Sequence, residues 1–326
     1  YPHFKSDFNI DLLHANNYMC HFLAVRKSLV DTVGGLNEKF DGAQDYDFVL
    51  RLTEHTKKIY HCPRILYHWR CSNQSTAASQ GNKMYAIHAG KAALNAHYKR
   101  LGWNARAQEG AVDGWYQTKF TLKEEPLVSI VIPNKDHTDD LDVCLTSFFE
   151  RADYQNYEFI IIENNSVLPE TFAYYEKIEK EHDNVKVVYW EAGFNYSAIN
   201  NFGFKFAKGD YIMLLNNDVE LITPDIFQSM LGFCMRPEVG IVGAKLLYND
   251  HTVQHAGVLV GAGGLADHVF KGIHEDDPGY MGRAISSQDV SAVTAACLLV
   301  KSTVYEEVGG LEDEFQVAVN DVDFCL

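Results

Sequence analysis

Apolar positions in the middle of the chain form short runs that alternate with segments of helical spacing. Continuous apolar runs predict strands buried on both faces at 127–133, 157–162, 185–189 and 211–215. Between the first two runs, a helix is indicated by apolar residues spaced three or four apart, namely Leu141, Cys144, Leu145 and Phe148. Further helices are predicted from Pro169 and over residues 197–207. This alternation predicts the α/β fold class, with a largely parallel sheet covered by helices.

Polar residues follow three of these predicted strands directly. They are Asn134-Lys135-Asp136, Glu163-Asn164-Asn165-Ser166 and Asn216-Asn217-Asp218. In open parallel sheets, ligands bind outside the carboxyl ends of the strands. We therefore expect the three segments to converge on one ligand.

The pattern beyond residue 220 is less regular. Thr223-Pro224 predicts a helix start with Thr as N-cap, and a strand is expected at 240–243. The glycine-rich stretch 257–282 predicts long loops near a site. Thr303 and Glu306 have the spacing of a capping box, and Gly309-Gly310 would stop that helix.

A motif near the N-terminus recurs near the C-terminus. Val33-Gly34-Gly35-Leu36 returns about 275 residues later as Val308-Gly309-Gly310-Leu311, and each copy leads into an Asp-x-Asp-Phe. The surrounding residues match with one residue inserted after Phe315, so the match extends well beyond the motif. We expect a late portion of one domain at 1–100, a linker at 101–126 with a helix at 83–100 before it, and a second, related domain at 127–326.

Composition indicates which kinds of partner the protein binds and in which cellular compartment it is found. The net charge of -16 argues against a nucleic-acid surface, and a nucleotide ligand would need a metal to offset its phosphates. Seven cysteines without Cys-x-x-Cys spacing favour reduced thiols and a cytoplasmic protein. No apolar run approaches the roughly 20 residues of a spanning helix, so any membrane association would be peripheral, at the inner face.

Two acidic motifs are candidates for chemistry. Asp218 at a strand end could hold a divalent metal that bridges a diphosphate, or the triplet could be a polar turn. Asp321, like Asp45 in the other copy, follows a glycine-stopped helix and begins another helix. Such an Asp could cap the helix or accept a proton from a hydroxyl, and its presence in both copies favours the second role.

Histidines and cysteines give weaker signals. His68 closes a predicted apolar strand and could be a metal ligand or a buried structural histidine. His255 and His268 lie in segments without ligand spacing. Cys297 has no evident base beside it, which favours a packed thiol over a nucleophile.

Several motifs in order resemble family 2 glycosyltransferases of the GT-A fold, and most of all the tandem, rhamnosyltransferase-like bacterial enzymes that build surface polysaccharides. The residues that carry the resemblance are 128–133, 163–166, Phe194-Asn195-Tyr196-Ser197-Ala198-Ile199-Asn200-Asn201, 214–218 and 320–323. Residues 4–70 resemble the acceptor half of a preceding domain of the same kind. The resemblance implies a Rossmann-like three-layer sandwich of the GT-A type.

The resemblance also implies roles for single residues. The nucleotide-sugar would be bound by Pro133, Asp136, Glu163, Asn165, Asn216 and Asn217. Asp218 would hold manganese or magnesium, and His68 matches the family's late metal-binding histidine. Asp321 would be the general base of an inverting transfer, and Asp45 is its counterpart. The family's metal motif often has Asp where this chain has Asn216, so Asp218 would carry most of the metal binding.

The expected function is transfer of a sugar from a nucleotide-sugar to a hydroxyl of a cell-surface polysaccharide or lipid-linked glycan. Because neither copy shows every motif in order, a catalytically incomplete nucleotide-sugar binder or scaffold stays open, as does self-association through the N-terminal segment. A nucleotidyltransferase is a third reading, but Asn134-Lys135-Asp136-His137 matches its phosphate loop poorly.

Overall fold

The structure is a computed structural model that describes residues 2–69 and 80–326, with side chains for 2–69 and 84–326. The chain divides into two compact units. Unit 1 comprises Tyr1–Thr121 together with Asp276–Asp289, and unit 2 comprises Leu122–Glu275 together with Val290–Leu326. The chain therefore passes from one unit to the other three times.

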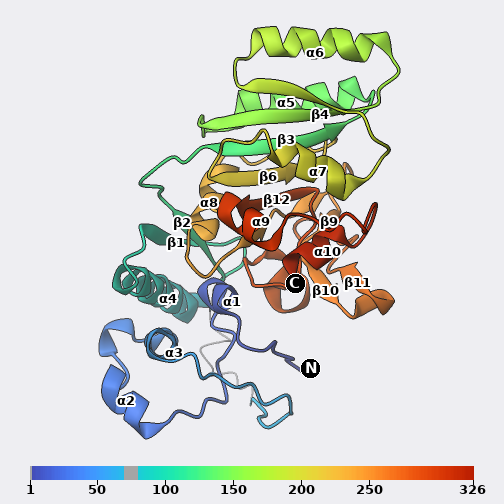
Figure 1. The fold of residues 1–326 in the computed structure, drawn as a ribbon. Helices are drawn as coiled ribbons and strands as arrows, with labels where there is room; N and C mark the ends of the chain where they lie inside the picture. Colours follow the sequence, from blue (N-terminus) through green and yellow to red (C-terminus); the bar gives the residue numbers. More distant parts are fainter. Residues whose placement is uncertain (1, 70–79) are drawn as a thin grey trace. The chain divides into compact units, whose positions relative to one another are not determined.

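Unit 2 is built on a six-stranded sheet of order β5-β4-β3-β6-β12-β7 (Figure 1). Its strands are β3 (Val128–Asn134), β4 (Tyr157–Asn164), β5 (Val185–Trp190), β6 (Tyr211–Leu215), β7 (Ile241–Gly243) and β12 (Cys297–Lys301). The first four are parallel, and β12 runs antiparallel between β6 and β7. This confirms the predicted strands and the largely parallel sheet.

Both faces of the sheet are buried because alternate residues of each strand enter different cores. In β3, Ile130 and Ile132 pack into one core, whereas Val131 packs into the other. The first core is covered by α5 (Thr138–Arg151), α6 (Pro169–Glu181) and α8 (Ile226–Cys234); the second is covered by α7 (Tyr196–Phe204), α9 (Ser302–Val308) and α10 (Asn320–Cys325). Helices on both faces confirm the three-layer arrangement.

Two predicted helix starts in unit 2 are wrong. Helix α8 begins at Ile226 with Asp225 as N-cap, because Thr223 and Pro224 lie in the turn before it. Helix α9 follows β12 without a loop, so its N-cap is Lys301 and the capping box of Thr303 and Glu306 does not form. The predicted stop is confirmed, since Gly309 adopts the left-handed conformation that ends α9.

The segment predicted as long loops contains short elements. The hairpin of β10 (Val258–Val260) and β11 (Ala266–His268) surrounds the turn η2 (Ala262–Gly264), and η3 (Tyr280–Ile285) follows within unit 1. The short strands β8 (Leu246–Leu247) and β9 (Val253–His255) pair just before it. Glycine and three-residue strands hide such a hairpin from a periodicity search.

Unit 1 is mainly helical. Its elements are α1 (Ile10–Ala15), α2 (Lys27–Val33), η1 (Glu38–Phe40), α3 (Gln44–His55), α4 (Gln80–Arg100), β1 (Ala105–Glu109), β2 (Tyr116–Phe120) and η3. Leu13, Leu50, Leu94 and Tyr98 are fully buried in its core. The predicted helix at 83–100 is confirmed as α4.

The segment 101–126, expected as a linker, is largely a hairpin of unit 1. Strands β1 and β2 pair along five residues each, and Tyr98 of α4 shares a hydrogen bond with Thr118 at 2.7 Å. Asn95 of α4 also accepts the backbone N–H of Ala107 at 2.8 Å. Strand β1 has only one buried residue, Ala107, and β2 has two, Tyr116 and Thr118. The alternation of apolar and polar residues along β1 is therefore too weak to predict a strand from the sequence.

Candidate active site

Hydrogen-bonded side chains connect the carboxyl ends of β3, β4 and β6. Asn217 Nδ2 donates to Asn134 Oδ1 at 2.6 Å, and Asn134 Nδ2 donates to the Tyr175 hydroxyl at 2.8 Å. That hydroxyl donates to Glu163 Oε2 at 3.0 Å. The three segments predicted to converge therefore do meet, and Tyr175, which the sequence did not single out, joins them.

Glu163 is a buried part of this network. It is 3% exposed, and its carboxylate accepts both the backbone N–H and the hydroxyl of Ser166. Both of its oxygens are thus used inside unit 2. This gives Glu163 the role of holding the turn at Ser166, while its predicted contact with a nucleoside stays a prediction.

Asp136 holds the same turn from the other side. Its N–H donates to Ser166 Oγ at 2.9 Å, and its Oδ1 accepts the N–H groups of Val167 and Leu168 at 2.9 and 3.0 Å. Desolvation acts to raise the pKa of Asp136, but these backbone donors, Thr171 and Lys135 lower it. The side chain is therefore ionised at neutral pH.

Asp136 and Asn165 both adopt positive φ, at 62° and 57°. Strained backbone of this kind in residues other than glycine clusters at binding sites. Asn165 is exposed, and its Nδ2 donates to the Ala192 carbonyl at 2.7 Å, which ties the end of β4 to the segment after β5. Pro133 lies half-buried in β3, one residue before the network begins.

The triplet Asn216-Asn217-Asp218 follows β6 directly, and Asp218 is exposed. In the ranges that the structure describes, no group of three or more His, Cys, Asp or Glu side chains is placed to hold a metal. Magnesium and manganese are often held by one or two carboxylates plus the phosphates of a substrate. The donor set at Asp218 fits a metal that arrives with a diphosphate and does not fit one held by the protein alone.

Asp321 is the second residue of α10, and its carboxylate binds backbone on both sides. Oδ1 accepts the N–H of Val322 at 2.9 Å, and Oδ2 accepts the N–H of Ala295 at 3.2 Å. The next carbonyl, that of Ala296, accepts the N–H of Asn216 at 3.0 Å. Asp321 and the triplet after β6 therefore contact adjacent residues of one segment, just before β12.

Tyr196 contacts the same segment before β12. Its hydroxyl donates to the Ala295 carbonyl at 3.2 Å. Burial, and then the charge of Asp321, raise the pKa of Tyr196. The sequence placed Tyr196 in a family motif but gave no indication that it lies beside the candidate base.

A pair of histidines lies beside Thr294, the residue before Ala295, and His255 of the pair contacts it. Thr294 N–H donates to His255 Nε2 at 3.4 Å, so His255 carries its proton on Nδ1 and donates to His268 Nδ1 at 2.8 Å. Burial and His268 lower the pKa of His255 to about 3. His255 is therefore neutral at neutral pH, and this pair, which had no ligand spacing in the sequence, lies beside the site.

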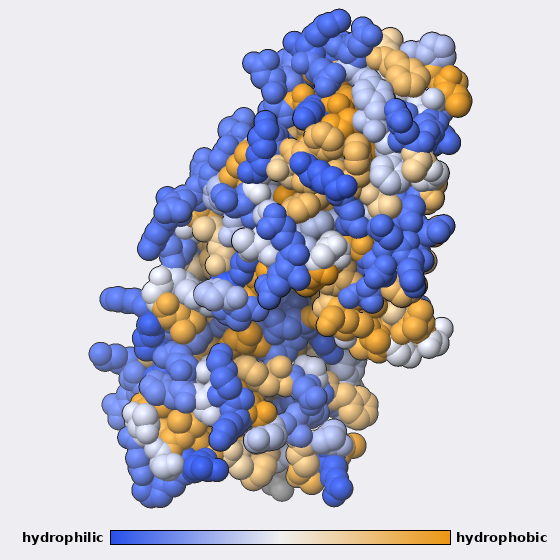
Figure 2. All heavy atoms as spheres, in the orientation of Figure 1, coloured by the Kyte–Doolittle hydropathy of each residue, from blue (hydrophilic) through white to orange (hydrophobic). Residues whose placement is uncertain are grey.

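The β10–β11 hairpin that carries His268 has an apolar surface. Leu259, Val260 and Leu265 are 51%, 41% and 64% exposed. Figure 2 shows apolar side chains gathered over this hairpin. Its strand β10 is joined to the segment before β12, because Val258 N–H donates to the Ala292 carbonyl at 2.8 Å. Exposed apolar surface of this kind often marks an interaction site.

The other two predicted site residues belong to unit 1. Asp45 is exposed at the second position of α3, where its Oδ1 accepts the N–H of Tyr46 at 2.9 Å, as Asp321 does with Val322. His68 is exposed in an extended segment, and the strand predicted to end at His68 does not form at 65–69. No ladder partner lies beside that segment within the described residues. Asp218 and Asp321, in contrast, belong to unit 2.

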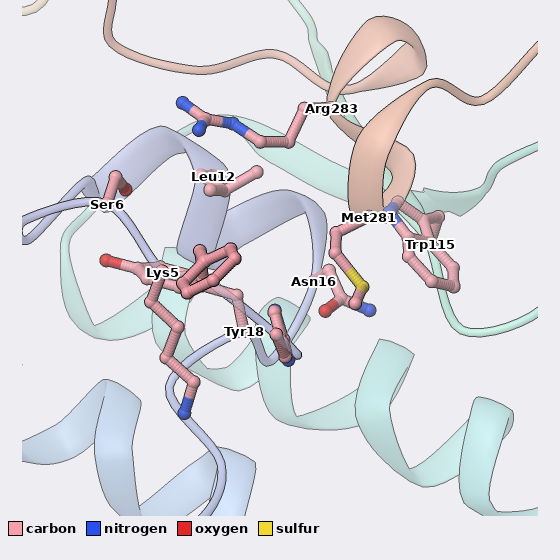
Figure 3. A pocket seen from close by; sticks show the side chains of 10 residues that line it. Lys5, Ser6, Leu12, Asn16, Tyr18, Trp115, Met281 and Arg283 are labelled. Carbon is pink, nitrogen blue, oxygen red and sulfur yellow. The ribbon is translucent and has the colours of Figure 1, made fainter. Parts of the chain in front are cut away.

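Unit 1 has a small cavity away from these residues (Figure 3). Its volume is about 70 Å³, and its lining includes Tyr18, Trp115, Met281 and Arg283. A water needs roughly 10–15 Å³ measured in this way, so the cavity fits a few waters and is too small for a nucleotide. None of the predicted site residues lines it.

Two further findings concern the cysteines and the helices. The cysteines at 20, 62, 144, 234, 297 and 325 are free, and Cys71 lies outside the described residues. Throughout 2–69 and 80–326, every helix is too short or too polar to cross a membrane.

Comparison with known proteins gives a family and several relatives. The model of the family described as glycosyl transferase family 2 matches residues 129–307. The uncharacterized protein y4gI of Sinorhizobium fredii is 41% identical over 331 residues, which cover 99% of this chain and 36% of the relative. The O-antigen biosynthesis protein RfbC of Myxococcus xanthus is 39% identical over 326 residues, covering 100% of this chain and 25% of the relative. The chain thus spans about a third and a quarter of these relatives.

Solved structures are similar to part of the chain. The mannosyltransferase PcManGT of Pyrobaculum calidifontis, in complex with GDP-Man and Mn2+, has a TM-score of 0.45 and 13% identity over 62% of this chain and 51% of that chain. TarS of S. aureus with UDP-GlcNAc has a TM-score of 0.44 and 14% identity over 61% and 52%. The GT-A-like α/β fold is confirmed by the sheet and by the family match.

Proposed function

We propose that this chain, which belongs to glycosyl transferase family 2, transfers a sugar from a nucleotide-sugar to a hydroxyl of a bacterial cell-surface glycan with inversion. One observation carries the proposal. Asp321 and the triplet ending in Asp218 both contact the short segment Ala295-Ala296 before β12. A base and a phosphate-binding carboxylate are needed on neighbouring positions for such a transfer.

The donor side would use the ends of β3, β4 and β6. The turn held by Asp136, Glu163 and Ser166 offers a rigid edge for the nucleoside, together with Pro133 and Asn165. Asn217, fixed by Asn134, and Asn216 would face the diphosphate. Asp218 would hold manganese or magnesium together with that diphosphate, and such a metal offsets the charge of the leaving group.

The acceptor side would use Asp321. Its carboxylate would accept the proton of the acceptor hydroxyl while the hydroxyl oxygen bonds to the anomeric carbon and the nucleoside diphosphate leaves from the opposite face. One displacement of this kind inverts the anomeric centre. Asp45 is proposed as the corresponding base of the related copy in unit 1.

The relative named as an O-antigen biosynthesis protein supports a cell-surface polysaccharide, or its lipid-linked precursor, as the acceptor. Residues 1–100 and 127–326 are proposed as portions of two related domains, because Val33-Gly34-Gly35-Leu36 and its neighbours recur at Val308-Gly309-Gly310-Leu311. Association with a membrane face or with a second copy stays a prediction.

A second candidate is binding of a nucleotide-sugar without turnover. It is favoured by the single carboxylate at Asp218 and by the lack of a three-residue metal group in the described ranges. Calorimetry with UDP, GDP and dTDP, each with and without Mn²⁺, followed by a transfer assay with the corresponding sugars, separates the two candidates.

Two substitutions give the decisive outcomes. Asp218→Ala is expected to abolish the manganese-dependent part of nucleotide binding, whereas Asp321→Asn is expected to keep that binding and lose transfer. Transfer that survives Asp321→Asn would overturn the proposed mechanism. Metal-dependent binding by the wild type without any transfer would favour the second candidate.

A further inference from the structure

Asn201, near the middle of α7, holds the start of the segment 311–316. Its Oδ1 accepts the N–H of Leu311 at 2.9 Å and the hydroxyl of Tyr305 at 2.8 Å. Its Nδ2 donates to the Leu311 carbonyl at 2.7 Å and to Asp313 Oδ1 at 2.9 Å. One amide side chain therefore makes three hydrogen bonds to residues between α9 and α10 and a fourth to Tyr305 of α9.

The first turn of α7 holds the rest of that segment. Asn195 caps α7 through Oδ1 and donates through Nδ2 to the Asp313 carbonyl at 2.9 Å. Ser197, which is fully buried, donates to the Phe315 carbonyl at 2.8 Å. The Tyr196 N–H donates to the Gln316 carbonyl at 2.9 Å. We call these contacts of Asn195, Ser197 and Asn201 the α7 clamp.

The clamped segment leads to a strained residue. Val319, the N-cap of α10, has φ 67° and ψ -4°. A β-branched residue at positive φ is a true outlier that persists only when its surroundings hold it. The corresponding N-cap in the other copy, Ala43, has φ -144° and ψ 28° and is not in this region. The inserted residue after Phe315 thus coincides with strain in one copy alone.

The clamped segment is connected to Asp321 through Phe315 and Asn320. Asn320 is buried, its Nδ2 donates to the Phe315 carbonyl at 3.2 Å, and its Oδ1 accepts the Asp321 N–H at 2.8 Å. The clamp, Phe315, Asn320 and Asp321 form a continuous hydrogen-bonded connection. It ends at the Asp321 carboxylate, which reaches the Ala295 amide.

We propose that Asn195, Ser197 and Asn201 are positioning residues for Asp321, and that they do so by holding Val319 in its left-handed conformation. The inference rests on the role proposed for Asp321. It assigns a purpose to the motif Phe194 to Asn201, which the sequence linked to the family without a role. The clamp fixes where the base points and has no contact with the donor side.

Substitutions in the clamp remove its hydrogen-bond donors without removing the oxygen that caps α7. Asn195→Asp keeps the oxygen that caps α7 and removes the donor to the Asp313 carbonyl. Asn201→Asp keeps the acceptor for Leu311 and Tyr305 but removes the donors and faces Asp313 with a second carboxylate. Each is expected to lower kcat by about ten-fold or more, since small misplacement of a catalytic group has effects of this size, and to leave the donor KM unchanged.

Val319→Asn and Val319→Gly test the strain itself and guard against variants that fail to fold. Asn and Gly tolerate positive φ, so both should keep Tm or raise it by about 2–4 °C. Because Asn and Gly adopt the left-handed conformation readily, either substitution alone should keep kcat near the wild-type value, and either should restore kcat when combined with Asn195→Asp. A failure of Val319→Asn to restore kcat in that double variant would overturn the role given to Val319.

Asp321→Asn is measured in parallel. If that variant loses transfer while the folded Asn195 and Asn201 variants keep kcat within about two-fold, a change too small for lost positioning, the clamp inference is overturned and the proposed function stands. If Asp321→Asn keeps transfer, both are overturned. Reduced kcat at unchanged donor KM and unchanged Tm supports the clamp.

Discussion

The two copies of the Val-Gly-Gly-Leu repeat form the same helices in different surroundings. Helices α2 (Lys27–Val33) and α9 (Ser302–Val308) have seven residues each and end at aligned glycines. The residues before α9 form β12, with Leu298 fully buried between β6 and β7. The aligned residues before α2 form no strand, and Leu23 is 38% exposed. Local sequence sets the helix, and only a neighbouring sheet makes the strand.

The loops after the two glycine stops are also held differently. In unit 2 the α7 clamp holds the loop from outside, and Leu311 is 2% exposed. In unit 1 Leu36 is 64% exposed, and Arg51 of α3 holds the loop by donating to the carbonyls of Val33 and Gly35 at 2.6 and 2.8 Å. In unit 2 the loop after the motif is thus held from outside by α7 and leads to the proposed base Asp321, whereas in unit 1 the loop is bound by the helix α3 that follows it.

The largest expected effect separates the two acidic positions. Asp321→Asn should lower the rate of transfer about 10²–10⁴-fold, the usual contribution of a general base. Asp45→Asn should change that rate by less than about two-fold, because Asp45 lies outside the unit that holds Asp218 and is proposed as the base of the other copy. Initial rates at saturating donor give the comparison. An equal loss in both variants would contradict it.

The next effect concerns packing at aligned leucines. Leu311→Ala should lower the free energy of unfolding by about 2–5 kcal/mol, because the side chain is buried against α9 and α10. Leu36→Ala should change it by no more than about 0.5 kcal/mol, since most of that side chain is exposed. Chemical denaturation, monitored by hydrogen exchange within each unit, measures the change in the free energy of unfolding for both variants. Similar losses would show that something covers Leu36 in solution.

The smallest effect concerns acid. The folded pKa of His255, about 3, lies below the ordinary 6.5, so the unfolded chain takes up a proton that the folded chain does not between these values. Stability of unit 2 should therefore fall with decreasing pH in this window, by up to about 1.4 kcal/mol per pH unit. His255→Gln should flatten that dependence.

Unit 1 contains its own histidine pair as a control for this experiment. His14 and His97 meet at 3.1 Å, and Asp11 and Glu54 lie 3.4 and 2.6 Å from the Nδ1 atoms of these two rings. Burial acts to raise the pKa of Glu54, but the hydrogen bonds from His97 and Arg100 lower it. Hydrogen exchange at pH 7 and 5.5 should show weakening in unit 2, whereas Glu54 of unit 1 causes no loss of stability in this window, because the stabilisation from its lowered pKa is lost only as pH falls towards and below the ordinary value of 4.5. Weakening of both units would contradict the assignment.

Much of the fold and part of the site could be predicted from the sequence. The apolar runs of β3 to β6 are continuous because both faces are buried, and polar residues at their ends had to share one edge. The place of Asp321 followed from the glycine stop before it. These features depend on residues close together along the chain.

What the sequence missed depends on contacts distant along the chain. The approach of His255 to Thr294 and the donation from Asn201 to Leu311 join residues with no common spacing. The left-handed Val319 goes against the preference of its own side chain, so no propensity could indicate it. His68 was placed on a strand because its apolar neighbours satisfy strand propensity, but a strand also needs a ladder partner.

The segment Asp276–Asp289 belongs to unit 1 although both its flanks belong to unit 2. Asn9 and Asp289 exchange hydrogen bonds at 2.7 and 3.0 Å, and Phe4 donates to Tyr280 at 2.7 Å. A gene fragment cut once, after residue 121, would leave these partners in different polypeptides. Recombination could therefore move unit 2 between proteins only together with unit 1, so the two units are expected to be inherited together.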